Sequence, residues 1–231
     1  MTVPATLDSD YGRLADAVQL AEVDAYVHVG DGTDDLVQYL TRIDPEDNLA
    51  AFVLTEAGAT AVIRPRYRPE AERKFPGGTI VETESGKPLA ETVTELFEAE
   101  PSVRVPDTTP VGVVRGLESN ASVEVIPEPD TVWCRKSEDE QAVAAHMADG
   151  VQRGIARAET VLADATVDGD AVVWDGDELT TERLRREISK ELADFGLRSM
   201  GNVVIGAGES CAELHFTGDE PIRPEIGRAH V

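Results

Sequence analysis

The chain has 231 residues and carries 45 acidic against 21 basic side chains, which gives a formal net charge of −24. Such an acidic surface repels phosphate backbones and anionic lipids, so nucleic acids and membranes are excluded as partners. No run approaches the ~20 apolar residues of a membrane span and the N-terminus has no apolar signal region, so we expect a cytoplasmic globular protein. The charge favours a halophilic cytoplasm, with an acidic mesophilic protein as the alternative.

The first half of the chain alternates short apolar runs of strand type with runs of helical spacing. We predict helices at Tyr11–Ala21, Asp34–Leu40, Pro69–Lys74 and Leu89–Glu98. We predict strands at Ala25–Val29, Leu49–Thr55, Thr60–Ile63, Thr79–Glu82, Val103–Val105, Val111–Val113 and Ser122–Val125. This alternation indicates an α/β fold in which helices cover a mixed sheet.

A proline-rich connector at Pro127–Asp130 leads to a second half with longer helices, which favours two domains. Ser137 and Glu140 have the spacing of a capping box at the start of a helix over Asp139–Ala163. The apolar positions of this helix recur every three or four residues, at Val143, Met147, Val151, Ile155, Ala158 and Leu162.

A linker rich in Asp and Gly, Val167–Glu178, follows this helix. The next pattern predicts a helix over Thr180–Phe195 that Gly196 terminates. A glycine-rich strand is then expected to approach His215.

Three features in this order resemble metallopeptidase family M24, the pita-bread group of Xaa-Pro aminopeptidases, prolidases and creatinases. They are residues 135–137 followed by Glu140, the helix opening at Leu179-Thr180, and the strand running to His215. The first half is similar to the creatinase-type N-terminal domain at residues 23–25, at 34–41, and at 52–55 followed by Gly58. The chain departs from the family pattern at Arg42, where glycine is usual.

The resemblance covers roughly residues 11–224 and implies an α/β (α+β) fold. We expect a creatinase-type N-terminal mixed-sheet domain at 1–130, a linker at 131–138, and the first, incomplete part of a pita-bread catalytic domain at 139–224. The resemblance implies that the full-length protein cleaves the peptide bond before proline with water activated by two divalent ions, Mn, Co or Zn. The partner is then a peptide with proline at the second position, and a homodimer is compatible with the family.

His215 is the candidate catalytic residue that the resemblance implies, contacting the substrate and stabilising the transition state without binding metal. An imidazole can donate or accept a proton near neutral pH, which suits that role. The family's metal ligands, two Asp, one His and two Glu, would lie beyond the end of the chain, so we expect no metal or cofactor site and no activity in these residues. A metal-independent creatinase-like hydrolase and a non-catalytic binding or assembly protein of the same fold are the alternatives.

The other polar clusters are better explained by structure. Two acidic pairs lack the spacing of a calcium loop and are interpreted as solvated turn residues, at Asp168/Asp170 and Asp175/Asp177. The segment Gly206–Gly208 lacks the lysine and the glycine spacing of a phosphate loop, so we expect close backbone approach there.

Isolated nucleophiles and imidazoles receive structural interpretations too. Ser210 has no nucleophile-elbow motif around it, and Cys134 and Cys211 are expected to be buried thiols without a disulfide. His28 is expected to be a structural or surface residue, with substrate gating as the weaker alternative, and His146 a partly exposed helix residue.

The last residues, EIGRAHV at 225–231, match the translation of a sequencing-library adapter start. We therefore expect an artefactual tail there and a natural protein that continues past Pro224, so Arg228 and His230 receive no role. A genuine short tail is the alternative.

Overall fold

The computed structural model describes residues 7, 9–129, 132, 134–198 and 203–224. Contacts between Cα atoms divide the chain into an N-terminal unit, Thr2–Gln141, and a C-terminal unit, Ala142–Val231. The domain boundaries derived from the family resemblance stay a prediction.

The N-terminal unit is built on a six-stranded mixed sheet in the order β4-β3-β2-β1-β5-β6. β1 pairs antiparallel with β2 and β2 with β3, whereas β3–β4, β1–β5 and β5–β6 are parallel pairs. The strands are β1 (Ala25–Gly30), β2 (Ala50–Thr55), β3 (Gly58–Ile63), β4 (Thr79–Glu82), β5 (Ser102–Pro106) and β6 (Ser122–Ile126).

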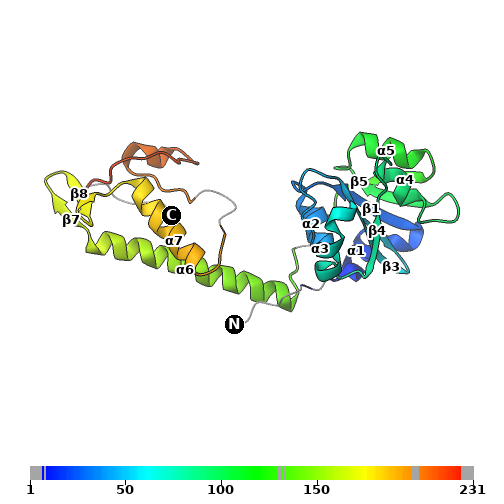
Figure 1. Cartoon of the computed structure of the whole chain (residues 1–231), viewed down its shortest axis with the longest axis horizontal. Helices are drawn as coiled ribbons and strands as arrows, with labels where there is room; N and C mark the ends of the chain where they lie inside the picture. The colour runs from blue at the N-terminus through cyan, green and yellow to red at the C-terminus, as the bar shows by residue number, and fades with distance from the viewer. Residues whose placement is uncertain (1–6, 8, 130–131, 133, 199–202, 225–231) are drawn as a thin grey trace. The chain divides into compact units, whose positions relative to one another are not determined.

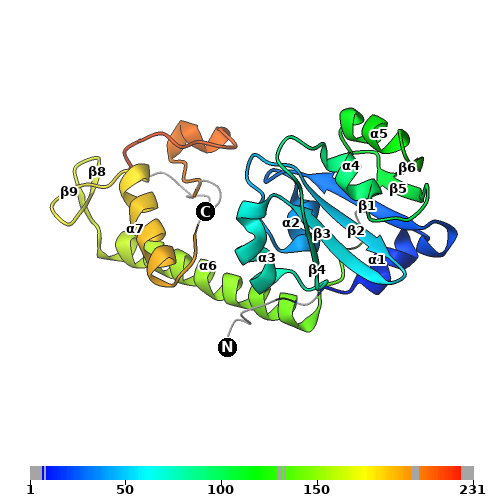
Figure 2. The ribbon, with the colours of Figure 1, turned by 45° about the vertical axis from the view of Figure 1, so that its right-hand side comes forward.

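Helices cover both faces of this sheet, as Figures 1 and 2 show. On one face, α1 (Tyr11–Ala17), α2 (Asp35–Thr41) and α3 (Arg68–Lys74) pack on Tyr26 and Phe52. On the other, α4 (Leu89–Thr94) and α5 (Val111–Glu118) pack on Val27, Val53 and Val105. Two 3-10 turns, η1 (Leu20–Glu22) and η2 (Pro65–Tyr67), complete the unit. The central strand β1 is buried along its whole length because side chains on both of its faces meet a core.

Three sequence predictions are wrong in this unit, one of them the end of the helix predicted over Leu89–Glu98, which stops at Thr94. The apolar run Val111–Val113 forms the start of helix α5, with Pro110 at its N-cap position. Val113 and Leu117 are one helical turn apart and both enter the core, a spacing that a three-residue window conceals. The helix predicted over Tyr11–Ala21 stops at Ala17, because Gln19 adopts a left-handed conformation with φ 50°.

The C-terminal unit contains most of α6 (Glu138–Asp164), α7 (Thr181–Asp194) and the 3-10 turn η3 (Gly208–Ala212). α7 lies alongside α6 (Figure 1), and their shared core includes Ala158, Val161, Leu184 and Ile188.

The segment expected to be a linker instead forms a small antiparallel sheet in the order β7-β8-β9. Its strands are β7 (Thr166–Asp168), β8 (Ala171–Trp174) and β9 (Asp177–Glu178). The Asp-Gly pairs are its tight turns, since Gly169, Asp175 and Gly176 all have positive φ. The four aspartates of the segment are exposed, as expected of solvated residues; Asp170 and Asp175 lie in turns, whereas Asp168 and Asp177 lie at strand ends and not in turns as predicted.

Most of the predicted apolar stripe of α6 does not face α7, and Ala158 is its one buried member. Met147 and Val151 keep 54% and 53% of their surface exposed, and Ile155 and Leu162 are exposed as well. The contact with α7 uses glycines instead: a Cβ atom at Gly154 would lie 3.1 Å from Ile188 Cγ2. Close approach of the two helices therefore depends on small residues, which a hydrophobicity pattern does not report.

Candidate functional site

His215 lies in an exposed turn that follows η3. The glycine-rich strand predicted to approach it is absent from the described residues 203–224, where η3 and an isolated bridge between Thr180 and Pro221 are found. A strand needs a neighbouring backbone for its hydrogen bonds, and no described strand lies beside this segment. The prediction of a strand was therefore wrong for this structure, and the catalytic role of His215 stays a prediction.

The first turn of α7 holds the segment that carries His215. The Thr181 hydroxyl donates to the carbonyl oxygen of Gly218 and accepts from the N–H of Glu220, each at 3.0 Å. The Thr181 N–H donates to the carbonyl oxygen of Glu220 at 2.9 Å. Because Thr181 is fully buried, these hydrogen bonds fix the chain three and five residues beyond His215.

Arg185 extends the same attachment from the next turn of α7. Its Nε donates to the carbonyl oxygen of Val203 at 2.8 Å, and its Nη atoms donate to Thr217 and Gly218 at 3.3 Å. One guanidinium thus ties both ends of the segment to a single helix. The imidazole of His215 is solvent-accessible on a backbone that α7 positions.

The glycine segment before His215 is a tight turn. Ser210 is buried, and its hydroxyl donates to the Ala207 carbonyl oxygen at 2.8 Å and accepts from the Ala207 N–H at 2.9 Å. A Cβ atom at Gly206 would lie 3.0 Å from the Cys211 backbone, so close backbone approach explains this glycine as expected. The hydroxyl of Ser210 is used structurally and is not available as a nucleophile.

The expectation that both cysteines are buried was wrong, because Cys134 and Cys211 are exposed. Cys211 sits on the outer side of η3 rather than in a strand that enters a core. Its thiol therefore does not fill a core position.

His28 is a structural residue, as expected, and its ring is completely buried. Its Nε2 lies 2.9 Å from Asp34 Oδ1, and that carboxylate also accepts from the Val37 N–H at the start of α2. Burial opposes the charge on Asp34, but the hydrogen bonds from His28 and Val37 outweigh it and lower the pKa of the carboxyl group. His28 therefore orients a helix cap and does not reach the solvent. His146 stacks on Phe195 with ring centroids 4.7 Å apart and is partly exposed, as expected.

The predicted capping box at the start of α6 is confirmed. Ser137 N–H donates to Glu140 Oε2 at 2.9 Å, and the Ser137 hydroxyl accepts from the Glu140 N–H at 3.2 Å. Glu140 also accepts from Arg42 Nη2 at 3.0 Å. Arg42 ends α2 with φ 59° and lies over the Tyr39 ring, so the residue that departs from the family's glycine has a structural role of its own.

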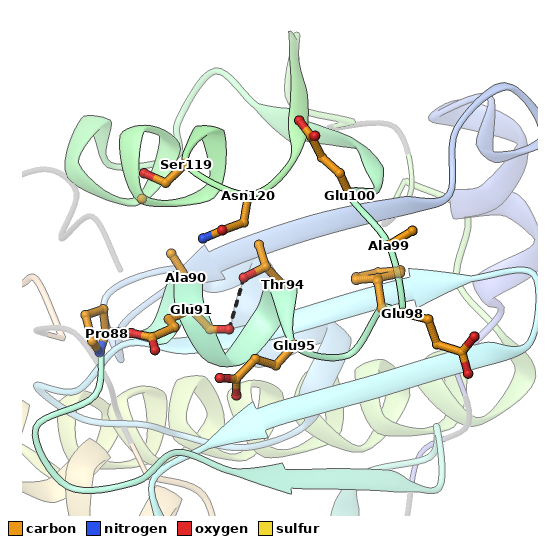
Figure 3. A pocket seen from close by; sticks show the side chains of 12 residues that line it. Pro88, Ala90, Glu91, Thr94, Glu95, Glu98, Ala99, Glu100, Ser119 and Asn120 are labelled. Carbon is orange, nitrogen blue, oxygen red and sulfur yellow. Dashed lines mark hydrogen bonds between the residues drawn. The ribbon is translucent and has the colours of Figure 1, made fainter.

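A pocket between α4 and α5 carries several carboxylates (Figure 3). Its lining includes Glu91, Glu95, Glu98 and Glu100, and the Thr94 hydroxyl donates to the Glu91 carbonyl oxygen at 3.1 Å. Its lining includes no histidine, cysteine or cation. Such a pocket holds no pair of groups for proton transfer at neutral pH.

The described residues do not fit a metal centre. Within the described ranges, no group of three or more His, Cys, Asp or Glu side chains converges in a way that could hold a metal ion. No chemical step can therefore be derived through a metal from these residues. None of the described helices combines the length and the apolar character needed to cross a membrane.

Comparison of the whole chain with known proteins gives fold similarity without sequence similarity. No family model and no curated protein matches the sequence. The prolidase from Pyrococcus horikoshii OT3 superposes with a TM-score of 0.63 at 13% identity, over 91% of this chain and 56% of that chain. A dipeptidase from Mycobacterium ulcerans gives 0.64 at 20% identity, over 92% of this chain and 57% of that chain.

An X-Pro aminopeptidase from Thermotoga maritima MSB8 gives a TM-score of 0.64 at 10% identity, over 90% of this chain and 57% of that chain. The predicted α/β fold class, with a mixed sheet in the N-terminal unit, is confirmed. The chain spans less than three fifths of the length of each of these enzymes.

Proposed function

We propose that this chain is part of a hydrolase of family M24 that cleaves the peptide bond before proline, as an Xaa-Pro aminopeptidase or dipeptidase. The observation that carries the proposal is the fold similarity to prolidases and an X-Pro aminopeptidase, which extends over nine tenths of the chain. In this assignment residues 1–130 form the N-terminal domain and residues 139–224 belong to the catalytic domain. The substrate is a peptide with proline at its second position.

In this proposal His215 contacts the substrate. Its exposed imidazole sits on a segment that Thr181 and Arg185 tie to α7, so the ring has a supported backbone and access to solvent. An imidazole N–H placed there donates to the oxygen on which negative charge develops as the peptide bond is attacked. Two divalent ions, Mn, Co or Zn, belong to the proposal for a protein that includes the rest of such a fold, since the described residues supply no metal site.

The experiment starts from the source DNA. The reading frame around this sequence is recovered, the encoded protein is purified, and hydrolysis of an Xaa-Pro dipeptide is measured with and without added Mn²⁺. We expect Mn²⁺-dependent cleavage. A frame without carboxylate and histidine ligands after residue 224, or a purified protein that binds metal but leaves the dipeptide intact, contradicts the proposal.

The variant His215→Ala tests the proposed role of His215 in substrate contact. We expect kcat to fall by about 10²–10³ with metal content unchanged, because one positioned hydrogen-bond donor is lost. His146→Ala is the matched control, since that ring stacks on Phe195 and should affect stability only. Loss of metal from the His215→Ala variant would show that His215 is a metal ligand. An unchanged kcat would show that His215 does not contact the substrate.

A further inference from the structure

A second pocket, with a volume of about 430 Å³, lies at the carboxyl ends of β3 and β4. Arg64 directly follows β3 and Thr83 directly follows β4, and both line it. These two strands are parallel neighbours, so their ends meet at the same edge of the sheet. Nothing in the proposed peptidase function uses this edge.

The chain leaves the two strand ends toward opposite faces. After β3 it enters η2 and α3, which pack with Tyr67 and Ala71 in the core that contains Phe52. After β4 it reaches α4, whose Ala90 and Val93 pack in the core on the other face. In open α/β sheets a crevice remains at such a point, and ligands bind in it.

Arg64 brings a positive charge without a counter-ion to this crevice. Its half-buried guanidinium makes no ion pair, hydrogen bond or ring contact with any residue in the described part of the chain. Its neighbours Arg66 and Arg68 both pair with glutamates. The second cation of the pocket, Lys87, is paired with Glu95. Asp47, which also lines the pocket, is exposed and forms no ion pair with Arg64, so the arginine is the pocket cation left for an incoming anion.

Thr83 supplies an independent observation. Only 2% of its surface is exposed, and its hydroxyl oxygen has no hydrogen-bond partner among the described residues. Its backbone N–H is already used, because it donates to the Ile63 carbonyl oxygen at 2.8 Å. A buried hydroxyl without a partner is unfavourable, so a ligand oxygen that accepts from it would be stabilised.

The rest of the wall is apolar on one side, whereas Asp47 and Asn48 line it at the other. Leu49, Leu89 and Val113 line the pocket, and Leu49 keeps 38% of its surface exposed. A Cβ atom built on Gly112, at the start of α5, would meet no atom within 4 Å. A ligand with an apolar body attached to its anionic group would therefore fit both parts of the wall.

We propose that this pocket binds the carboxylate of a small monocarboxylic acid with an apolar body. The Arg64 guanidinium and the Thr83 hydroxyl donate to the carboxylate, and the apolar body contacts Leu49, Leu89 and Val113. The binding is independent of peptide hydrolysis, so it is measurable in the chain as it stands.

The probe is hexanoate, titrated by calorimetry at one fixed KCl concentration, with inorganic phosphate and 1-hexanol as comparison compounds. We expect saturable hexanoate binding with a Kd on the order of 1 mM. Arg64→Gln should weaken binding by about ten-fold or more, since a charge-assisted hydrogen bond is lost. Arg73→Gln is the matched control, because that exposed arginine on α3 carries the same charge and does not line the pocket.

Two further variants separate binding from folding. Gly112→Leu places a side chain in open space and should abolish binding while circular dichroism shows a folded chain. Thr83→Val should weaken binding several-fold and raise the melting temperature without ligand, since it removes the unpaired hydroxyl. Absence of saturable binding, equal binding of phosphate or hexanol, or equal losses in Arg64→Gln and Arg73→Gln would overturn the proposal.

Discussion

Replacing Arg42 by glycine tests whether a buried ion pair outweighs backbone strain. Arg42 has φ 59° and ψ 20°, a left-handed conformation that costs a residue with a Cβ atom about 1 kcal/mol and costs glycine almost nothing. The variant Arg42→Gly therefore gains about 1 kcal/mol from the backbone. It also restores the residue that the resembling family usually has.

The side chain opposes this gain. Arg42 Nη2 lies 3.0 Å from Glu140 Oε1, and the two side chains keep only 13% and 8% of their surface exposed. Removing one partner of such a pair typically costs about 3–5 kcal/mol. We expect the lower end of this range, about 3 kcal/mol, because Glu140 keeps the hydrogen bond from the Ser137 N–H. The variant should then be destabilised by about 2 kcal/mol in total.

The assay is urea unfolding of the whole chain at neutral pH, followed by circular dichroism and by amide exchange in α2. A double-mutant cycle with Glu140→Gln isolates the pair, and we expect a coupling of about 1–3 kcal/mol. If Arg42→Gly is as stable as the parent chain or more stable, the ion pair does not offset the strain and the reasoning is refuted.

The same pair predicts a pH dependence. Burial raises the pKa of Glu140, but hydrogen bonds from Ser137, Arg42 and Tyr39 outweigh it, and the pKa is lowered from its usual value of 4.5. A carboxyl group with a lowered folded pKa stabilises the fold above the unfolded pKa, and that stabilisation is lost as pH falls through the folded value. The stability difference between the parent chain and Arg42→Gly should therefore shrink below about pH 4.5. A difference that stays constant down to pH 3 would contradict the pairing.

Three further predictions address charge and packing. The midpoint of thermal unfolding should rise substantially between dilute and molar KCl, because salt shortens the screening length to about 3 Å at 1 M; an unchanged or lower midpoint contradicts the halophile hypothesis. Val151→Glu on the exposed side of α6 should change the free energy of unfolding by less than about 0.5 kcal/mol, whereas Ala158→Glu should prevent packing on α7. Equal effects of the two variants in urea unfolding would contradict the observed orientation of the helix. Gly150→Val should lower the free energy of unfolding by about 1–3 kcal/mol, because a Cβ atom there would overlap Leu197 Cδ1. Ala148→Val is the exposed control, and an unchanged free energy of unfolding in Gly150→Val would show that Leu197 moves aside at little cost.

The sequence predicts most of the N-terminal unit because its signals are local. The strand at Thr79–Glu82 is found with the predicted limits, and Asp34 caps α2 through its side chain. The capping box of α6 spans only three residues and was equally readable. Such features depend on neighbouring residues, so one chain without an alignment suffices.

The errors share a different physical origin. Val111–Val113 is too short to separate a strand from a helix, and the Asp-Gly turns of the second sheet were interpreted as an irregular linker. The strand toward His215 was expected from family order, but its formation depends on a neighbouring strand that the described chain does not supply. The ion pair of Arg42 with Glu140 is not predictable from local sequence, because the two residues lie 98 positions apart. The sequence shows only that Arg42 replaces the glycine usual in the family.

Helix α6 belongs to both units, because it begins at Glu138 and the boundary between the units lies after Gln141. A four-residue piece of helix is not stable alone, since a helix needs several turns to offset the cost of nucleation. The carboxylate that Arg42 binds is therefore held in place by helical turns that the C-terminal unit provides. An N-terminal fragment prepared for biophysical work should therefore extend several turns past residue 141, so that the helix that carries Glu140 can form.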